Sequence, residues 1–136
     1  MLGAMSSENV EVVRSAHEAF NRGGPRAALD YLDPEIEWHD VPDQPDATVR
    51  HGHEGFLRAF DVFLESFAEF TVEPEELRDL GDQVLVVGRT RGRGVDSGAE
   101  FNQEVVSLWS LRAGKIVETR FFGSRAEALE AAGRQK

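Results

Sequence analysis

An aspartate follows two large apolar side chains in one short stretch of the chain, and this stretch could do acid–base chemistry. In EIEWHDVPD (35–43), Ile36, Trp38 and Asp40 alternate with polar residues. A β-strand would place these three side chains on one face. A carboxylate beside Trp38 would be partly desolvated, which would make it a stronger base for removing a proton next to a carbonyl. Alternatively, Asp40 caps the turn that follows or faces solvent.

A histidine in the first predicted helix could take part in the same chemistry. His17 lies one helical turn from Val13 and from Phe20, so the helix should direct it inward. An inward imidazole could donate a hydrogen bond to a substrate oxygen, or it could orient Asp40. It could equally be a core residue that is satisfied within the protein. We therefore predict Asp40 and His17 as the candidate catalytic residues.

The other histidines do not form an evident metal site. His39 has the opposite strand parity to Asp40 and should lie on the outer face of the sheet. His51 and His53 flank Gly52, but no carboxylate or third histidine stands at a convincing spacing from them. The sequence therefore predicts no metal site and no cofactor.

The elements that would hold these residues are a group of helices followed by a run of strands. Apolar spacing, caps and turn residues predict helices at about residues 7–20, 26–32, 53–67 and 125–133, and strands at about 35–41, 70–77, 81–94, 99–112 and 115–123. Residues 41–55 show no period and are predicted to be a loop. Pro74 suits an edge strand or a bulge. This order favours an α+β fold with helices packed on one sheet face.

Length and composition limit the class of protein. A chain of 136 residues favours a single domain spanning residues 1–136. Its formal charge of −10 works against a nucleic-acid partner. No apolar run approaches the roughly 20 residues that cross a bilayer, and the first residues lack the features of a secretory signal. The chain has no cysteine. We expect a cytoplasmic protein without nucleic-acid or membrane partners.

Five stretches along the chain resemble one protein family. They are VVRSAHEAFNRGG, EWHDVP, RHGHEGFLRAF, LRAGKIVETRFF and RAEALEAAG. Together with the order of elements, they resemble the SnoaL-like branch of the nuclear transport factor 2-like (NTF2-like) superfamily, which is related to ketosteroid isomerases and polyketide cyclases. The resemblance implies a cone-shaped α+β fold, in which a strongly curved, mainly antiparallel sheet packs around N-terminal helices and one long helix. It also implies an open-ended apolar cavity and a homodimer formed through the outer sheet face.

The resemblance also bears on individual residues. Ketosteroid isomerases carry a general-base aspartate on the first strand, and Asp40 is the matching position here. Where they place an oxyanion-hole tyrosine on the first helix, this chain has Ala16, with His17 adjacent. Where they place a protonated aspartate on the long strand, this chain has Ser107. Many SnoaL-like proteins have an acidic residue after the last strand, and Gly123 stands there instead. One of three isomerase elements is present, which argues against steroid isomerisation.

With this fold, strand parity predicts which side chains line the cavity. The predicted lining residues are Trp38, Phe60, Phe63, Thr90, Phe101, Gln103, Val105, Ser107, Trp109, Thr119 and Phe121. A mostly apolar set with few polar groups is typical of a site for a small hydrophobic molecule. Gln103 and Ser107 could hydrogen-bond a ligand, or they could be satisfied within the protein.

The opposite parity predicts the outer face of the sheet. Val106 and Leu108 should lie there, and a homodimer interface would explain them. Three alternating arginines, Arg89, Arg91 and Arg93, should lie there too. We expect them to form ion pairs with Glu104 or Glu118 on neighbouring strands.

Three functions are compatible with these features. The leading hypothesis is a protein that binds a small hydrophobic ligand and carries out cofactor-free isomerisation or aldol-type cyclisation. Asp40 would be the general base, and His17, Gln103 or Ser107 would stabilise the developing oxyanion. The alternatives are a non-catalytic ligand-binding module and a dimerisation module. Epoxide hydrolysis ranks lower, because it needs two acids and an arginine in the pocket, and parity directs Arg89, Arg91 and Arg120 outward.

Overall fold

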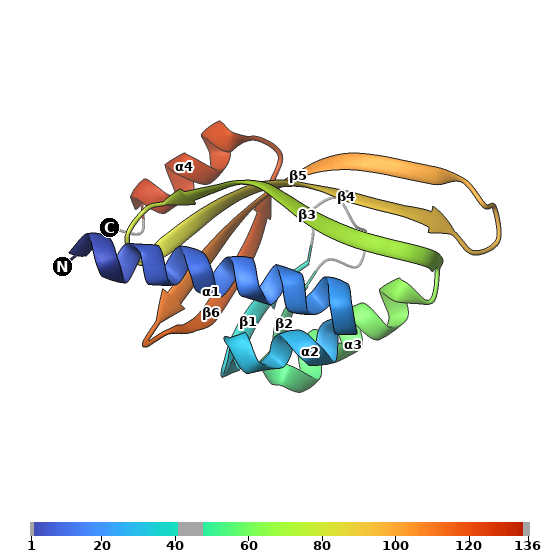
Figure 1. Cartoon of the computed structure of the whole chain (residues 1–136), viewed down its shortest axis with the longest axis horizontal. Helices are drawn as coiled ribbons and strands as arrows, with labels where there is room; N and C mark the ends of the chain where they lie inside the picture. Colours follow the sequence, from blue (N-terminus) through green and yellow to red (C-terminus); the bar gives the residue numbers. More distant parts are fainter. Residues whose placement is uncertain (1, 41–47, 135–136) are drawn as a thin grey trace.

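The computed structural model describes the backbone of residues 2–40 and 48–134, and the side chains of residues 8–40, 48–61 and 64–133. In chain order, its elements are α1 (Leu2–Gly23), α2 (Pro25–Ala28), the 3-10 helix η1 (Leu29–Tyr31), β1 (Leu32–His39), β2 (Val49–His51), α3 (Gly52–Leu64), β3 (Phe67–Asp79), β4 (Gln83–Gly94), β5 (Glu100–Arg112), β6 (Lys115–Phe122) and α4 (Arg125–Arg134). Figure 1 shows their arrangement.

The strands form one curved sheet in the order β2-β1-β6-β5-β4-β3. Strand β1 runs parallel to β6, and the four other neighbouring pairs of described strands are antiparallel. Helices α1, α2 and α3 lie on one side of the sheet, and α4 lies on the opposite side (Figure 1). The predicted fold class, a mainly antiparallel curved sheet packed around N-terminal helices, is confirmed.

Two apolar cores lie on the two faces of the sheet. The larger one packs between the sheet and the N-terminal helices and includes Val13, Ile36 and Val84. The smaller one lies under α4 and includes Leu85 and Ala128. Because successive strand residues point to opposite faces, a strand between two cores needs apolar residues at every position. This requirement explains the unbroken run VLVV (84–87) in β4.

Helix α4 covers part of the outer face that the sequence analysis assigned to a dimer interface. Val106 packs in the smaller core with Leu85 and with Ala128 of α4. Leu108 is also buried within this single chain. These outward-facing apolar side chains therefore need no second subunit to cover them. Homodimerisation through the outer face stays a prediction.

The predicted loop over residues 41–55 is wrong in its second half. Residues Val49–His51 form β2, which pairs antiparallel with β1, and α3 already begins at Gly52. At the N-terminus, α1 begins at Leu2, several residues before the predicted start. Three residues are too few to show a period of two, so no strand signal is visible in the sequence at β2.

The edge strand β3 is protected by a side chain of α1. As predicted, β3 lies at an edge of the sheet, with an irregularity between Pro74 and Glu76. The Nδ2 of Asn21 donates a hydrogen bond to the carbonyl of Val72 at 2.8 Å, and the Val72 N–H donates to Oδ1 of Asn21 at 3.0 Å. This amide satisfies the open edge in the way that another strand would.

The arginine stripe of β4 lies on the outer face and pairs with acids on both neighbouring strands. The predicted partners, Glu104 and Glu118, are wrong. The observed pairs are Arg89–Glu75 at 3.5 Å, Arg91–Glu73 at 3.5 Å and Arg93–Glu100 at 3.0 Å.

In the described part of the chain, no helix has the length and apolar character that a membrane crossing requires.

Candidate functional site

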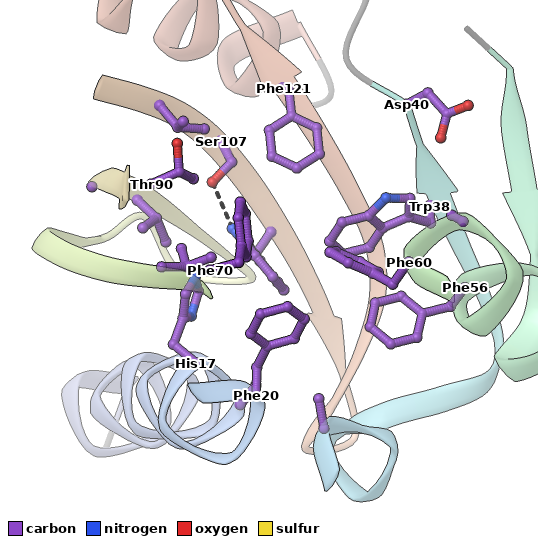
Figure 2. Close-up of a pocket in the computed structure, with 18 of the residues that line it drawn as sticks. His17, Phe20, Trp38, Asp40, Phe56, Phe60, Phe70, Thr90, Ser107 and Phe121 are labelled. Carbon is purple, nitrogen blue, oxygen red and sulfur yellow. Dashed lines mark hydrogen bonds between the residues drawn. The ribbon is translucent and has the colours of Figure 1, made fainter. Parts of the chain in front are cut away.

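A pocket of about 1470 Å³ lies between the inner face of the sheet and helices α1 and α3. Figure 2 shows side chains from both layers directed into it. The predicted site residues found on its wall are His17, Trp38, Asp40, Phe60, Thr90, Phe101, Gln103, Val105, Ser107, Trp109 and Phe121. Strand parity therefore placed most of these side chains correctly, while their roles stay predictions.

Two predicted lining residues are not among them. The side chain of Phe63 lies outside the described residues. Thr119 is fully buried and does not line the pocket, and its Oγ1 has no hydrogen-bond partner among the described residues. It pairs with Trp38 on one side and Trp109 on the other, and these two indoles contact each other at 5.8 Å. The two large indoles cover the short side chain of Thr119. Strand parity predicts the face on which a side chain lies, but not whether larger neighbours cover it.

Aromatic rings form the central wall of the pocket. The ring of Trp38 packs edge-on against Phe56, Phe60 and Phe121, with centroid distances of 5.0, 5.3 and 5.6 Å. Phe20 of α1 extends this cluster by an edge-to-face contact with Phe60 at 5.1 Å. Such contacts hold large rings in fixed orientations with little loss of side-chain freedom on binding. The wall suits a flat, apolar guest.

His17 lies in the pocket wall with one nitrogen engaged. Its Nδ1 is 2.8 Å from the carbonyl oxygen of Val13, one turn earlier in α1. The ring packs against Trp109 at a centroid distance of 4.9 Å. Burial removes water from the imidazole and lowers the pKa of His17 below its ordinary value of 6.5, although the bond to Val13 opposes the shift. At neutral pH this histidine is therefore uncharged.

Ser107 and Trp109 form a hydrogen bond inside the pocket wall. The indole Nε1–H of Trp109 donates to Oγ of Ser107 at 2.8 Å, and both side chains are buried (Figure 2). The Ser107 hydroxyl accepts this bond, so its own proton is available for an acceptor in the pocket. The sequence left open whether Ser107 was satisfied internally, and the structure shows that it is satisfied as an acceptor.

Asp40 borders the pocket but is held by two donors. Its side chain is 9% exposed. Its Oδ2 accepts from the backbone N–H of Thr48 at 3.2 Å and from Nη2 of Arg50 at 3.2 Å, and its Oδ1 lies 3.5 Å from Nε of Arg50. This ion pair explains how a carboxylate can lie beside Trp38, because an unpaired buried charge would be costly.

Arg50 is one of the charged residues of the pocket wall that the sequence did not predict; the others are Arg58, Asp61 and Glu104. Alternation along the long strands predicted their arginines on the outer face of the sheet. Arg50 comes instead from β2, where no strand was predicted. In the β1–β2 pair, Arg50 stands opposite Trp38, so both side chains lie on the inner face. A hairpin hypothesis for the segment after Asp40 would have found it.

His17 and Asp40 do not act on each other. The only described hydrogen bond of His17 goes to Val13, and the described partners of Asp40 are Thr48 and Arg50. Figure 2 shows the two side chains on opposite sides of the pocket, with aromatic rings between them. The suggestion that His17 orients Asp40 is therefore wrong, and a ligand would meet the two groups at different ends.

The one group of potential metal ligands among the described residues lies away from the pocket. Glu37, His39 and Glu118 offer ligand atoms within 4.8 Å of one another on the outer face. The Nε2 of His39 lies 3.2 Å from Glu118 and 3.6 Å from Glu37. The hydrogen bond between His39 and Glu118 accounts for much of this grouping without an ion.

The sequence is similar to one known protein family. A model of the SnoaL-like domain family matches residues 13–119. No curated protein matches the sequence.

Solved structures of similar fold cover nearly the whole chain. An NTF2-like protein from Burkholderia thailandensis is 28% identical, with 94% of this chain and 97% of that chain covered and a TM-score of 0.75. TerC, co-crystallized with polyporic acid, is 20% identical over 90% and 96% of the two chains, with a TM-score of 0.76. A protein with a ketosteroid isomerase-like fold from Catenulispora acidiphila is 17% identical over 90% and 92%, with a TM-score of 0.72.

Proposed function

Because this chain belongs to the SnoaL-like domain family, we propose that it binds a small, flat, mainly apolar molecule in the pocket between its sheet and its N-terminal helices. The observation that carries this proposal is the cluster of aromatic rings around Trp38, which lines the pocket. A volume of about 1470 Å³ exceeds the roughly 300–1,000 Å³ typical of small-molecule sites, so the pocket has room for a guest of several rings.

The Asp40–Arg50 pair places a partly buried ion pair in the wall of this mainly apolar pocket. Arg50 uses Nε and Nη2 on Asp40, and its Nη1 has no acceptor among the described residues. A guanidinium with spare donors is suited to a carbonyl or carboxylate oxygen. The ligand proposed here is therefore apolar along most of its length, with an oxygen at the end that meets Arg50.

Binding is tested by isothermal titration with flat apolar compounds. The panel includes naphthalene derivatives and polyporic acid, because the similar fold of TerC was co-crystallized with that compound. We expect saturable binding that weakens about tenfold or more in Phe60→Ala, which removes a ring from the wall. Arg91→Ala, on the outer face, should bind as the wild type does. Absence of binding across the panel, or equal affinity in Phe60→Ala, would refute the proposal.

A second candidate function is acid–base catalysis on the bound molecule. Two groups that can take a proton lie in the wall, the Asp40 carboxylate and Nε2 of His17. A base removes a proton from the carbon next to a carbonyl, the C–H electron pair forms an enolate, and a donor stabilises the oxyanion. The single N–H of neutral His17 is donated to the Val13 carbonyl oxygen, so Arg50 and Ser107 are better donors to a ligand than the predicted His17. Isomerisation and aldol-type cyclisation both begin with this step.

Catalysis is tested by following exchange of ketone α-protons in D₂O by NMR, which needs no knowledge of the product. The wild type should accelerate exchange for ketones that bind in the titrations. Asp40→Asn or His17→Phe should slow exchange by about 10²-fold or more, whichever residue is the base. If binding is retained and the wild type accelerates no exchange, the protein is a non-catalytic binding module.

A further inference from the structure

The pocket wall around Trp109 contains a hydrogen-bond acceptor that no described residue uses. His17 lines the pocket, and its Nδ1 lies 2.8 Å from the carbonyl oxygen of Val13. A carbonyl oxygen can only accept, so the proton of the neutral imidazole must be on Nδ1. Nε2 then carries a lone pair and no hydrogen. Burial opposes protonation of the ring, so this tautomer persists at neutral pH.

No described residue donates a hydrogen bond to this lone pair. The indole of Trp109 packs against the His17 ring at a centroid distance of 4.9 Å. The N–H of this indole is already given to Oγ of Ser107 at 2.8 Å. The indole therefore supports the imidazole by ring contact and leaves Nε2 without a partner. An unused acceptor in a buried site favours a guest that supplies the missing donor.

We infer that the ligand is a hydroxylated aromatic compound, such as a phenol or naphthol, whose O–H donates a hydrogen bond to Nε2 of His17. This inference rests on the proposed function, because it names the chemical class of the molecule that the pocket binds. The aromatic rings of the wall provide the surface for the flat skeleton, and His17 selects for the hydroxyl. A methyl group of similar size at the same place would leave the lone pair unsatisfied.

Two probes that differ only at this group test the inference. 2-Naphthol has a hydroxyl group, and 2-methylnaphthalene has a methyl group of similar size without a donor. Isothermal titration gives the ratio of their affinities in the wild type and in His17→Phe. We expect the ratio of naphthol to methylnaphthalene affinity to fall about tenfold in His17→Phe, because the hydroxyl loses its acceptor. Phe121→Leu, on another part of the wall, should weaken both probes and leave their ratio unchanged.

A second measurement uses the wild-type protein, so it does not depend on the folding of a variant. With ¹⁵N-labelled histidine, NMR distinguishes a protonated from an unprotonated ring nitrogen. We expect Nε2 of His17 to be unprotonated, and its resonance to move on addition of 2-naphthol and not of 2-methylnaphthalene. A proton on Nε2, or an equal response to both probes, overturns the inference. If both probes bind and the affinity ratio is the same in His17→Phe, the inference fails and the proposed function stands. If neither probe nor any other flat compound binds, both fail.

Discussion

The two halves of strand β4 show how one strand can hold the fold and also frame a pocket. Its first half, residues 83–88, is buried at every position, whereas its second half, residues 89–94, contains half-buried and exposed positions. The first half lies between the larger core and the smaller core under α4. The second half extends with β5 beyond α4 (Figure 1), with the pocket on one face and the arginine stripe on the other. The pocket wall takes Val86 and Gly88 from the first half and Thr90 from the second. Stability should therefore depend mainly on the first half, and substitutions in the second half should cost less.

The largest expected effect is in the first half of β4. Leu85 is fully buried under α4. Leu85→Ala should lower the free energy of unfolding by about 2–5 kcal/mol, because it leaves a cavity that the packed helix cannot fill. Thr90→Ala, in the second half of the same strand, should cost less than about 1 kcal/mol. Urea unfolding of both variants measures the difference, and equal losses would contradict the division of β4 into two regions.

A smaller effect is expected where α1 supports β3 beside the second half of β4. Val72, which accepts one hydrogen bond from Asn21 and donates another to it, pairs with Thr90. Asn21→Ala should reduce stability by about 1 kcal/mol, since two partly solvated hydrogen bonds are lost. Asn21→Asp keeps the acceptor and should lose part of that amount. An unchanged urea midpoint for Asn21→Ala would show that these two hydrogen bonds do not stabilise the edge strand β3.

The next expected effect appears only in acid and concerns the pocket wall. Burial holds the folded-state pKa of His17 below 6.5, so as the pH falls through 6.5 the unfolded chain binds this proton first. The contribution of His17 to stability is therefore complete above pH 6.5 and decreases as the pH falls below it. Urea unfolding between pH 8 and pH 5 should show a steeper loss for the wild type than for His17→Phe. Parallel curves would contradict a neutral, buried His17.

The smallest effect is expected on the outer face of the second half. Arg91 pairs with Glu73 at 3.5 Å, and both side chains are about half exposed. Arg91→Ala should change the free energy of unfolding by no more than about 0.5 kcal/mol, because exposed ion pairs contribute little. A loss as large as that of Leu85→Ala would mean that this surface is covered by something other than water, such as a second subunit.

The fold and much of the pocket wall could be predicted because the long strands carry a clear period. In β5, alternation from Phe101 to Trp109 was enough to assign Gln103, Val105 and Ser107 to the inner face, where the structure has them. Thr119 fits the same parity, but two neighbouring indoles cover it, and parity cannot measure the length of neighbouring side chains.

Other features depend on contacts that no local pattern shows. Arg50 comes from a three-residue strand whose place is fixed by its pairing with β1. The tautomer of His17 depends on the position of the Val13 carbonyl oxygen, which leaves Nε2 able to accept a hydrogen bond and unable to donate one. The cover of Val106 by α4 joins segments that are distant in sequence. In each case the deciding partner is a backbone atom or a segment that a periodic pattern does not locate.

Both tryptophans of the chain, Trp38 and Trp109, are in the pocket wall, and they contact each other there. Their indole emission is therefore sensitive to the one place where a guest would be in contact with them. The unlabelled protein can report occupancy through quenching or a spectral shift, provided the guest does not absorb and emit at the same wavelengths. Metabolite mixtures could thus be screened optically, without first choosing a reaction to assay.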